Sequence, residues 1–228
     1  MLCKIADLIV QLPEEDGLQE RCADYLYAGN RAPDMVIDPG QYRREPYPGG
    51  ICSPSLAYME SGHQFSESLI PYGGFSLHAS AVMLDGKVYL FSGNCGVGKS
   101  THARLWRQTF PNAVIINDDK PAMRCIDGVW YAYGTPWCGK ERIHYNAKAP
   151  VAGLCFLEQA DHNAIFPMTP AQALQAVLAQ TIYKYGQPAQ LDAMLELLDH
   201  FLNTVPIFRL ENRPEPEAAL LSKNTMEK

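Results

Sequence analysis

The sequence predicts an α/β protein of mixed α+β type, with hairpins in mixed sheets, one helix behind a glycine-rich loop and two amphipathic helices toward the C-terminus. Two Asp-Gly pairs, Asp85-Gly86 and Asp127-Gly128, lie between short apolar segments, and such pairs favour two-residue hairpin turns. Beyond residue 168, apolar residues recur at helical instead of strand spacing. These observations indicate hairpins and one helix first, and paired helices later in the chain.

The N-terminal stretch, residues 1–72, is predicted to form an α/β lobe that is a candidate for substrate binding. The apolar run at 4–12 is interrupted by Asp7 and is not followed by a small-residue cleavage site, so it indicates an opening strand and not a signal peptide. Helices are expected at 14–29 and 53–70. The intervening segment, 30–50, is rich in Pro and Gly and is expected to be a loop.

Residues 73–228 are predicted to form the catalytic core. Strands are expected at 75–84, 87–92, 113–117, 122–126, 129–134, 150–159, 163–168 and 205–211. A helix is expected from Lys99 to Phe110, where Pro111 ends it. Thr169, Pro170 and Gln172 form a helix-start signature, and the apolar spacing that follows predicts helices over 170–182 and 191–202.

The composition restricts the class of protein. With 47% hydrophobic and 19% charged residues among 228, the chain is globular and not intrinsically disordered. Its net charge of −6 weighs against nucleic-acid binding, which depends on phosphate neutralisation. No run of about 18 apolar residues occurs, so no membrane span is expected. Seven scattered cysteines without a CxxC pair favour reduced thiols, and we expect a cytoplasmic protein.

The glycine-rich loop fits the phosphate-binding pattern G-x-x-x-x-G-K-[ST]. It consists of Gly93, Asn94, Cys95, Gly96, Val97, Gly98, Lys99 and Ser100, and Thr101 follows. Glycines let successive backbone amides form a concave anion site at a helix N-terminus. Lys99 can then reach the β- and γ-phosphates of a nucleotide, and Ser100 can bind Mg²⁺. The alternative is a glycine turn that only joins a strand to a helix.

Two adjacent carboxylates follow the next predicted strand. Asp118 and Asp119 come directly after the apolar run 113–117, at a strand end where ligands bind in open α/β sheets. One carboxylate, with Asp118 as the metal candidate, can hold Mg²⁺ beside the phosphates. The other can accept a proton from an attacking hydroxyl. The alternative is an ordinary strand-to-turn boundary, because Asn-Asp-Asp is a common turn sequence.

A further candidate segment, Gly134 to Asn146, combines small and charged residues. Lys140 first, and Arg142 second, are candidates to neutralise charge during phosphoryl transfer, and Trp137 is a candidate wall of the pocket. The alternative is a hairpin loop with a buried tryptophan. His102 is expected on the surface of its helix, whereas His78 by its strand context alone is expected to be structural.

The segment from His78 to Thr101, together with the residues 116–120 (INDDK), resembles the HPr kinase/phosphorylase group within the phosphoenolpyruvate carboxykinase-like fold. Segment 133–146 resembles one found in uncharacterised bacterial members of this group. The resemblance matches His78, Lys99, Ser100, Asp118 and Asp119 to the family's site. It implies that His78 borders the phosphates, that Asp119 or Asp118 is the base, and that the fold is two-lobed and rich in β-structure.

Together these features predict an ATP-dependent kinase that uses Mg²⁺ and transfers the γ-phosphoryl group to a hydroxyl of an unidentified small molecule, peptide or protein. A nucleotide-binding regulator or slow ATPase is the main alternative, and a carboxykinase-like enzyme with a carboxylic acid acceptor is another. ATP is favoured, but the sequence leaves ATP against GTP open, as it does the oligomeric state.

Overall fold

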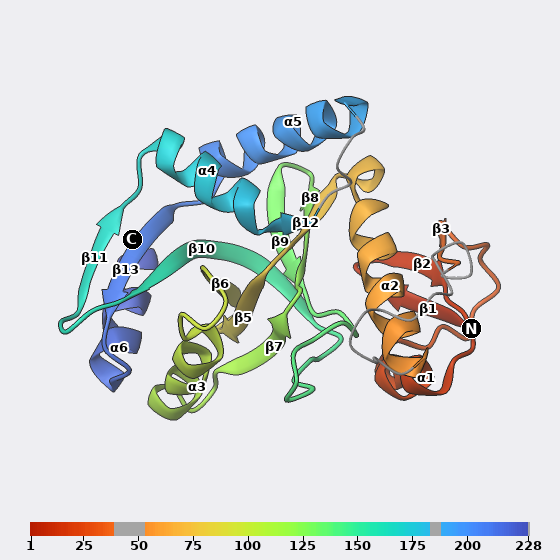
Figure 1. Cartoon of the computed structure of the whole chain (residues 1–228), viewed down its shortest axis with the longest axis horizontal. Helices are drawn as coiled ribbons and strands as arrows, with labels where there is room; N and C mark the ends of the chain where they lie inside the picture. The colour runs from red at the N-terminus through yellow and green to blue at the C-terminus, as the bar shows by residue number, and fades with distance from the viewer. Residues whose placement is uncertain (39–52, 183–187, 228) are drawn as a thin grey trace.

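The structure is a computed structural model that describes residues 1–38, 53–182 and 188–227 (Figure 1). Its strands are β1 (Leu2–Ile5), β2 (Leu8–Gln11), β3 (Met35–Val36), β4 (Gly74–Leu77), β5 (Ala79–Leu84), β6 (Lys87–Ser92), β7 (Val114–Asp119), β8 (Ala122–Ile126), β9 (Val129–Tyr133), β10 (Lys148–Gln159), β11 (Ala164–Pro167), β12 (Thr181–Ile182) and β13 (Ile207–Asn212). Its helices are α1 (Asp16–Cys22), α2 (Ser53–Glu67), α3 (Lys99–Thr109), α4 (Pro170–Gln180), α5 (Pro188–Thr204) and α6 (Pro216–Met226). The mixed α/β class is confirmed. Most of the loop expected over 30–50 lies outside the described residues.

The larger sheet is mixed and joins ten of the described strands. Its order is β12-β4-β8-β9-β10-β6-β5-β7, and β13 pairs with both β10 and β11. The long strand β10 connects the two halves of this sheet. Its first residues pair antiparallel with β9, and its later residues lie between β6 and β13, parallel to both. The carboxyl ends of β6, β10 and β13 therefore lie at one edge of the sheet.

Helices cover both faces of this sheet (Figure 1). Along β6, Val88 and Leu90 belong to the core cluster that contains α4 and α5 residues, whereas Tyr89 and Phe91 belong to the cluster that contains α3 and α6 residues. Successive strand side chains point to opposite faces. A strand buried on both faces therefore reads as a continuous apolar run, as β6 does.

The strand expected over 75–84 is two strands. β4 ends at Leu77 and pairs with β8 and β12, whereas β5 begins at Ala79 and pairs with β6 and β7. His78 stands at the change from one pairing to the other, and its backbone N–H donates to the carbonyl of Gln180 at 2.8 Å. The apolar pattern does not show this break, because the residues on both sides of His78 are buried.

The N-terminal sheet also departs from the prediction. The single strand expected over 4–12 was wrong, because β1 and β2 form an antiparallel hairpin. Ala6 (φ 51°) and Asp7 (φ 61°) both take left-handed conformations at its turn, which is the geometry of a tight type I′ hairpin. The turn sequence Ala6-Asp7 lacks the glycine by which such turns are recognised, so the sequence did not predict the hairpin.

The N-terminal elements pack directly on the larger sheet. One core cluster combines residues from before position 72, such as Phe65, with Ala122, Tyr133 and Trp137. Trp137 is 2% exposed, lies with its ring centroid 4.7 Å from that of Phe65 and donates to the Ser61 hydroxyl at 3.1 Å. Trp137 is therefore not a wall of the ligand pocket: its ring is buried in this core cluster, in agreement with the alternative of a buried tryptophan.

The C-terminal helix α6 was not predicted. It packs on α3, where Ser222 lies 3.3 Å from His102 Nε2 and accepts a hydrogen bond from Trp106 Nε1 at 3.1 Å. The expectation that His102 faces the helix surface was wrong, since the side chain is 1% exposed. Trp106 Nε1 also donates to His102 Nε2 at 3.2 Å, so the buried imidazole is held between Trp106 and Ser222.

The buried His102 predicts a loss of stability in acid. Burial lowers its pKa from 6.5 to about 3, so between these values the unfolded chain binds a proton that the folded chain does not. Stability therefore falls as the pH drops, by about 2 kcal/mol between pH 7 and pH 5 from this group alone. Urea unfolding at both pH values measures the difference. The variant His102→Gln is expected to lose this part of the pH dependence of the unfolding free energy. The control variant His63→Gln, at an exposed position, is expected to keep it. An unchanged pH dependence in His102→Gln would contradict the assignment.

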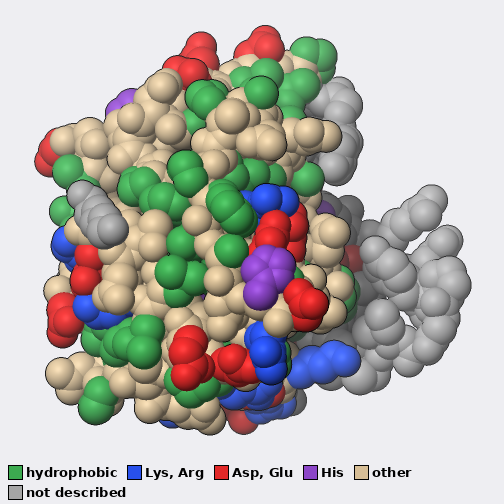
Figure 2. Space-filling model, turned by 90° about the vertical axis from the view of Figure 1, so that its left-hand side faces the viewer, with side chains coloured by type: hydrophobic (Ala, Val, Ile, Leu, Met, Phe, Trp, Pro, Cys, Tyr) green, Lys and Arg blue, Asp and Glu red, His purple; other side chains and the backbone are tan. Residues whose placement is uncertain are grey.

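One face of the molecule carries charges of both signs (Figure 2). Acidic and basic side chains are interspersed there with hydrophobic ones, and β13, on this side of the molecule, carries an Arg209–Glu211 ion pair at 3.0 Å. This face therefore lacks the single-sign basic patch that nucleic acid favours. Among the helices of the described residues, none is both long and apolar enough to cross a membrane.

Candidate functional site

The glycine-rich loop joins the end of β6 to the start of α3. Gly93, Gly96 and Gly98 have φ values of 136°, 79° and 109°, a region that side chains other than glycine rarely adopt. A Cβ built at Gly96 or Gly98 would meet no atom within 4 Å, so space is open beside both. Because α3 begins at Lys99, its first amides have no intrahelical acceptor. The loop therefore presents free donors beside an open space.

Lys99 lies against its own loop. Its Nζ donates to the carbonyls of Gly93 at 2.9 Å and Asn94 at 3.2 Å. Partial burial lowers the pKa of the ammonium group, although the acidic groups of Cys95, Asp119 and Asp118 act in the opposite direction. The side chain is thus held at the loop, where a bound anion can replace the two carbonyls.

The carboxylate pair ends β7, beside β5. In this antiparallel pairing Asp119 lies opposite Ala79, and Asp118 lies opposite Ser80. Asp118 is 6% exposed and accepts a hydrogen bond from the Ser80 hydroxyl at 2.5 Å. The side chain of Asp119 is 29% exposed. The two neighbours therefore differ in access to a ligand.

His78 fixes the position of Asp119. Its Nε2 lies 3.3 Å from Asp119 Oδ1, and its Nδ1 lies 3.0 Å from Gln180 Oε1. Burial alone raises the pKa of Asp119, but the hydrogen bond from His78 and the positive charges of Lys120 and Lys99 outweigh burial, and the net pKa is lowered. Asp119 is therefore ionised at neutral pH and held in one orientation.

These groups line one pocket of about 460 Å³. Its lining consists of His78, Cys95, Gly96, Gly98, Lys99, Ser100, Thr101, Arg104, Asp118, Asp119, Gly139, Lys140 and Glu141. The structure thus brings together most of the residues singled out in the sequence. Gly93, Asn94 and Val97 belong to the same loop but do not line this pocket.

The segment around Gly139 closes the pocket beside the carboxylates. Its N–H donates to the carbonyl of Asp118 at 2.7 Å, and Asp119 and Cys138 form an isolated β-bridge. A Cβ at Gly139 would lie 2.7 Å from the Asp118 carbonyl oxygen, too close for any other residue without a shift of backbone. This close approach brings Lys140 into the pocket lining.

An ion pair that the sequence did not predict lies at this pocket. Arg104 and Glu141 bond through Nη1 and Oε1, linking α3 to the segment that carries Lys140. Helical spacing could have identified Arg104 as a pocket residue, because Arg104 follows Ser100 by about one turn and lies on the same face of α3. Arg104 adds a guanidinium group to the pocket, beside the lysines Lys99 and Lys140 that the sequence had suggested.

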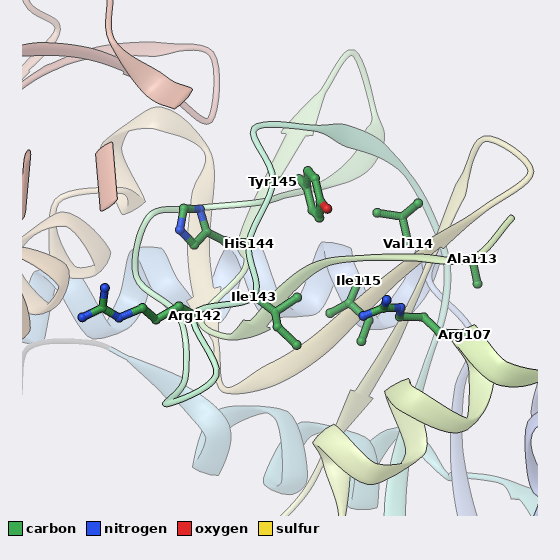
Figure 3. Close-up of a pocket in the computed structure, with 8 residues that line it drawn as sticks. All are labelled: Arg107, Ala113, Val114, Ile115, Arg142, Ile143, His144 and Tyr145. Carbon is green, nitrogen blue, oxygen red and sulfur yellow. The ribbon is translucent and has the colours of Figure 1, made fainter. Parts of the chain in front are cut away.

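Arg142, the second candidate of this segment, does not line the pocket that contains Lys99 and the carboxylates. The residue has a left-handed φ of 55°, and its guanidinium forms an ion pair with Glu20 of α1 at 2.9 Å. It lines a separate pocket of about 280 Å³. Figure 3 shows Arg142 and Arg107 at opposite ends of that pocket, with Ile143 between them. The change of chain direction at Arg142 turns its side chain away from the glycine-rich loop.

The oxygen atoms of this pocket suit a metal ion that is also bound by the phosphates of a nucleotide. Among the described residues there is no group of three or more His, Cys, Asp or Glu side chains that could hold a metal ion. The pocket is lined by the carboxylates of Asp118, Asp119 and Glu141 and by the Ser100 hydroxyl, which are hard oxygen donors, and Glu141 is already paired with Arg104. Mg²⁺ is commonly held by one or two carboxylates together with phosphate oxygens and water. The residues present fit that mode of binding.

No family model matches the chain. No curated protein matches it by sequence. Among solved structures, the chain is similar to the Hpr(Ser) kinase/phosphatase from Coxiella burnetii, with 11% identity and a TM-score of 0.38 over 67% of this chain and 99% of the other.

Proposed function

We propose that this protein is a kinase that binds ATP with Mg²⁺ and transfers the γ-phosphoryl group to a hydroxyl acceptor. One observation carries the proposal: a single pocket is lined by the open glycine-rich loop, by Lys99 and by the carboxylate pair Asp118 and Asp119. Phosphoryl transfer needs an anion cradle, charge neutralisation and a group that orients the nucleophile. This pocket offers all three.

The loop and the cations of the pocket are assigned to the phosphates. The amides at the start of α3 would bind phosphate oxygens, and Lys99 would exchange its two loop carbonyls for the β- and γ-phosphates. Arg104 and Lys140 approach from two different elements. They would neutralise the charge that spreads over the transferred group in the transition state.

The two carboxylates are assigned different roles. Asp118, buried and bonded to Ser80, would hold the metal together with the Ser100 hydroxyl. Mg²⁺ would supply further charge neutralisation at the phosphate oxygens. Asp119, more exposed and ionised because of its lowered pKa, would accept the proton of the attacking hydroxyl. His78 would hold Asp119 in place.

The N-terminal lobe, residues 1–72, is proposed to position the acceptor side of the core, residues 73–228. Tyr58 of α2 accepts a hydrogen bond from the backbone N–H of Cys138 at 2.7 Å, and Arg21 of α1 donates to Cys138 Sγ at 3.2 Å. Cys138 directly precedes Gly139 and Lys140 in the pocket wall. Movement of the lobe would therefore be transmitted to this wall.

The test is phosphoryl transfer from γ-labelled ATP with Mg²⁺ to fractionated extracts that supply small molecules, peptides and proteins. A labelled acceptor whose phosphate resists hydroxylamine supports the proposal. Label released only as free phosphate would instead indicate a slow ATPase or regulator, and a hydroxylamine-labile product would indicate a carboxylic acid acceptor. Omission of Mg²⁺ in the presence of EDTA is the control and is expected to stop transfer.

A further inference from the structure

A second pocket adjoins the glycine-rich loop. It has a volume of about 430 Å³, within the range of small-molecule sites. Gly96, Gly98 and Thr101 line both this pocket and the one that contains Asp118 and Asp119. The other lining residues are Val97, His102, Leu105, Gln159, Ala160, Asn212 and Pro214. A ligand that follows the loop can therefore occupy both pockets at once.

The two pockets differ sharply in charge. The first is lined by Lys99, Arg104, Lys140 and three carboxylates, whereas no Asp, Glu, Lys or Arg stands among the described residues that line the second. His102, at its base, is neutral at physiological pH because of its burial. Desolvating a charged group without a partner is costly, so the second pocket favours an uncharged part of a ligand.

Two carboxamides lie side by side in this second pocket. Gln159 ends β10 and Asn212 ends β13, and the two residues are directly paired in the parallel register of these strands. Their present bonds are long: Gln159 Nε2 donates to the Gly96 carbonyl at 3.4 Å, and Asn212 Nδ2 donates to the Arg213 carbonyl at 3.3 Å. Both bonds involve exposed groups and are readily exchanged for a ligand.

The second pocket lies at the carboxyl ends of three parallel strands, where nucleotides commonly bind. The loop leaves the carboxyl end of β6, which is parallel to β10, and β10 is parallel to β13. Ligands of open α/β sheets bind beyond the carboxyl ends of such strands. The apolar side chains of Val97, Leu105 and Pro214 complete walls suited to a flat ring.

We propose that this second pocket receives the adenine base of the nucleotide, read by Gln159 and Asn212. This inference rests on the proposed function. A carboxamide offers one donor and one acceptor, which match the amino group and a neighbouring ring nitrogen of adenine. Guanine presents two adjacent donors that a carboxylate would match, and the described lining of the second pocket contains none. The triphosphate would run along Gly96, Gly98 and Thr101 into the first pocket.

The test compares ATP, GTP and inorganic tripolyphosphate by calorimetry, each with Mg²⁺. The wild type is expected to bind ATP about tenfold or more tightly than GTP or tripolyphosphate. The double variant Gln159→Ala/Asn212→Ala is expected to lose about tenfold in ATP affinity and none for tripolyphosphate. Retained tripolyphosphate binding also shows that the variant is folded. The control Asn112→Ala, in the exposed turn after α3, is expected to match the wild type.

The outcomes separate this inference from the proposed function. Equal binding of ATP and tripolyphosphate by the wild type, tighter binding of GTP, or unchanged ATP affinity in the double variant would overturn the base assignment and leave the phosphate site intact. Failure of the wild type to bind any of the three ligands would overturn both.

Discussion

Replacing Lys99 by methionine is expected to lower kcat/KM for ATP by about 10²–10³-fold, the size of effect that removal of one transition-state donor produces. Methionine keeps the length of the side chain and removes its charge. The Lys99 ammonium group lies 2.9 Å from the Gly93 carbonyl of the loop. It is therefore close enough to bind phosphates that occupy the loop. Steady-state kinetics with γ-labelled ATP measure the loss of kcat/KM, and calorimetry measures the accompanying loss of ATP affinity.

Lys87→Met is the matched control for this variant. Lys87 is an exposed lysine at the start of β6, the strand that leads into the loop, and it does not line the pocket. Its replacement is expected to leave both ATP binding and turnover unchanged. Lys99→Met protein that binds and turns over ATP as the wild type does would show that the loop is a structural turn and not a phosphate site.

Replacing Asp119 by asparagine is expected to lower kcat by about 10²–10⁴-fold, the usual contribution of a general base, with ATP affinity retained. Asparagine preserves the shape of the side chain and an oxygen to accept the hydrogen bond of His78, now 3.3 Å from Asp119 Oδ1. It cannot accept the proton of an attacking hydroxyl. Single-turnover transfer and equilibrium ATP binding, measured on the same protein, separate chemistry from affinity.

Asp127→Asn is the control for the carboxylate. Asp127 has a left-handed φ of 50° in the turn between β8 and β9, a conformation that asparagine also tolerates. This variant is expected to transfer phosphate at the wild-type rate. If Asp119→Asn kept its kcat, Asp119 would not be the base. A loss of ATP affinity without a loss of kcat would instead indicate that Asp119 binds the metal ion.

Local patterns predicted the features that depend on neighbouring residues. Asp85-Gly86 and Asp127-Gly128 are hairpin turns with left-handed φ, and Thr169 with Gln172 forms the capping box at the start of α4. The glycine-rich loop and the carboxylates each follow a strand, and on that basis they were expected to lie near one another; they line one pocket. These features are encoded within a few residues, where turn and cap chemistry act.

Features that depend on distant partners were misplaced or missed. His102 was expected at the surface, but α6, an unpredicted helix, covers it through Ser222. Arg142 was a candidate to approach the γ-phosphate or the acceptor, but it forms an ion pair with Glu20 of α1 and lines a different pocket. Periodicity describes one element at a time, and the partner that buries or pairs a side chain lies in another.

By itself the sequence predicted the mixed α/β class of fold, the glycine-rich loop with its lysine, and the two adjacent carboxylates, because each of these depends on contiguous residues whose backbone preferences act locally. The assignment of the loop to phosphates stays a prediction. Only the tertiary structure decided that His78 holds Asp119, that Arg104 and Lys140 enter the same pocket, and that Gln159 and Asn212 stand together beside the loop. The physical reason is strand pairing. The register of β5 with β7 and of β10 with β13 places residues far apart in the chain side by side, and no local preference specifies that register.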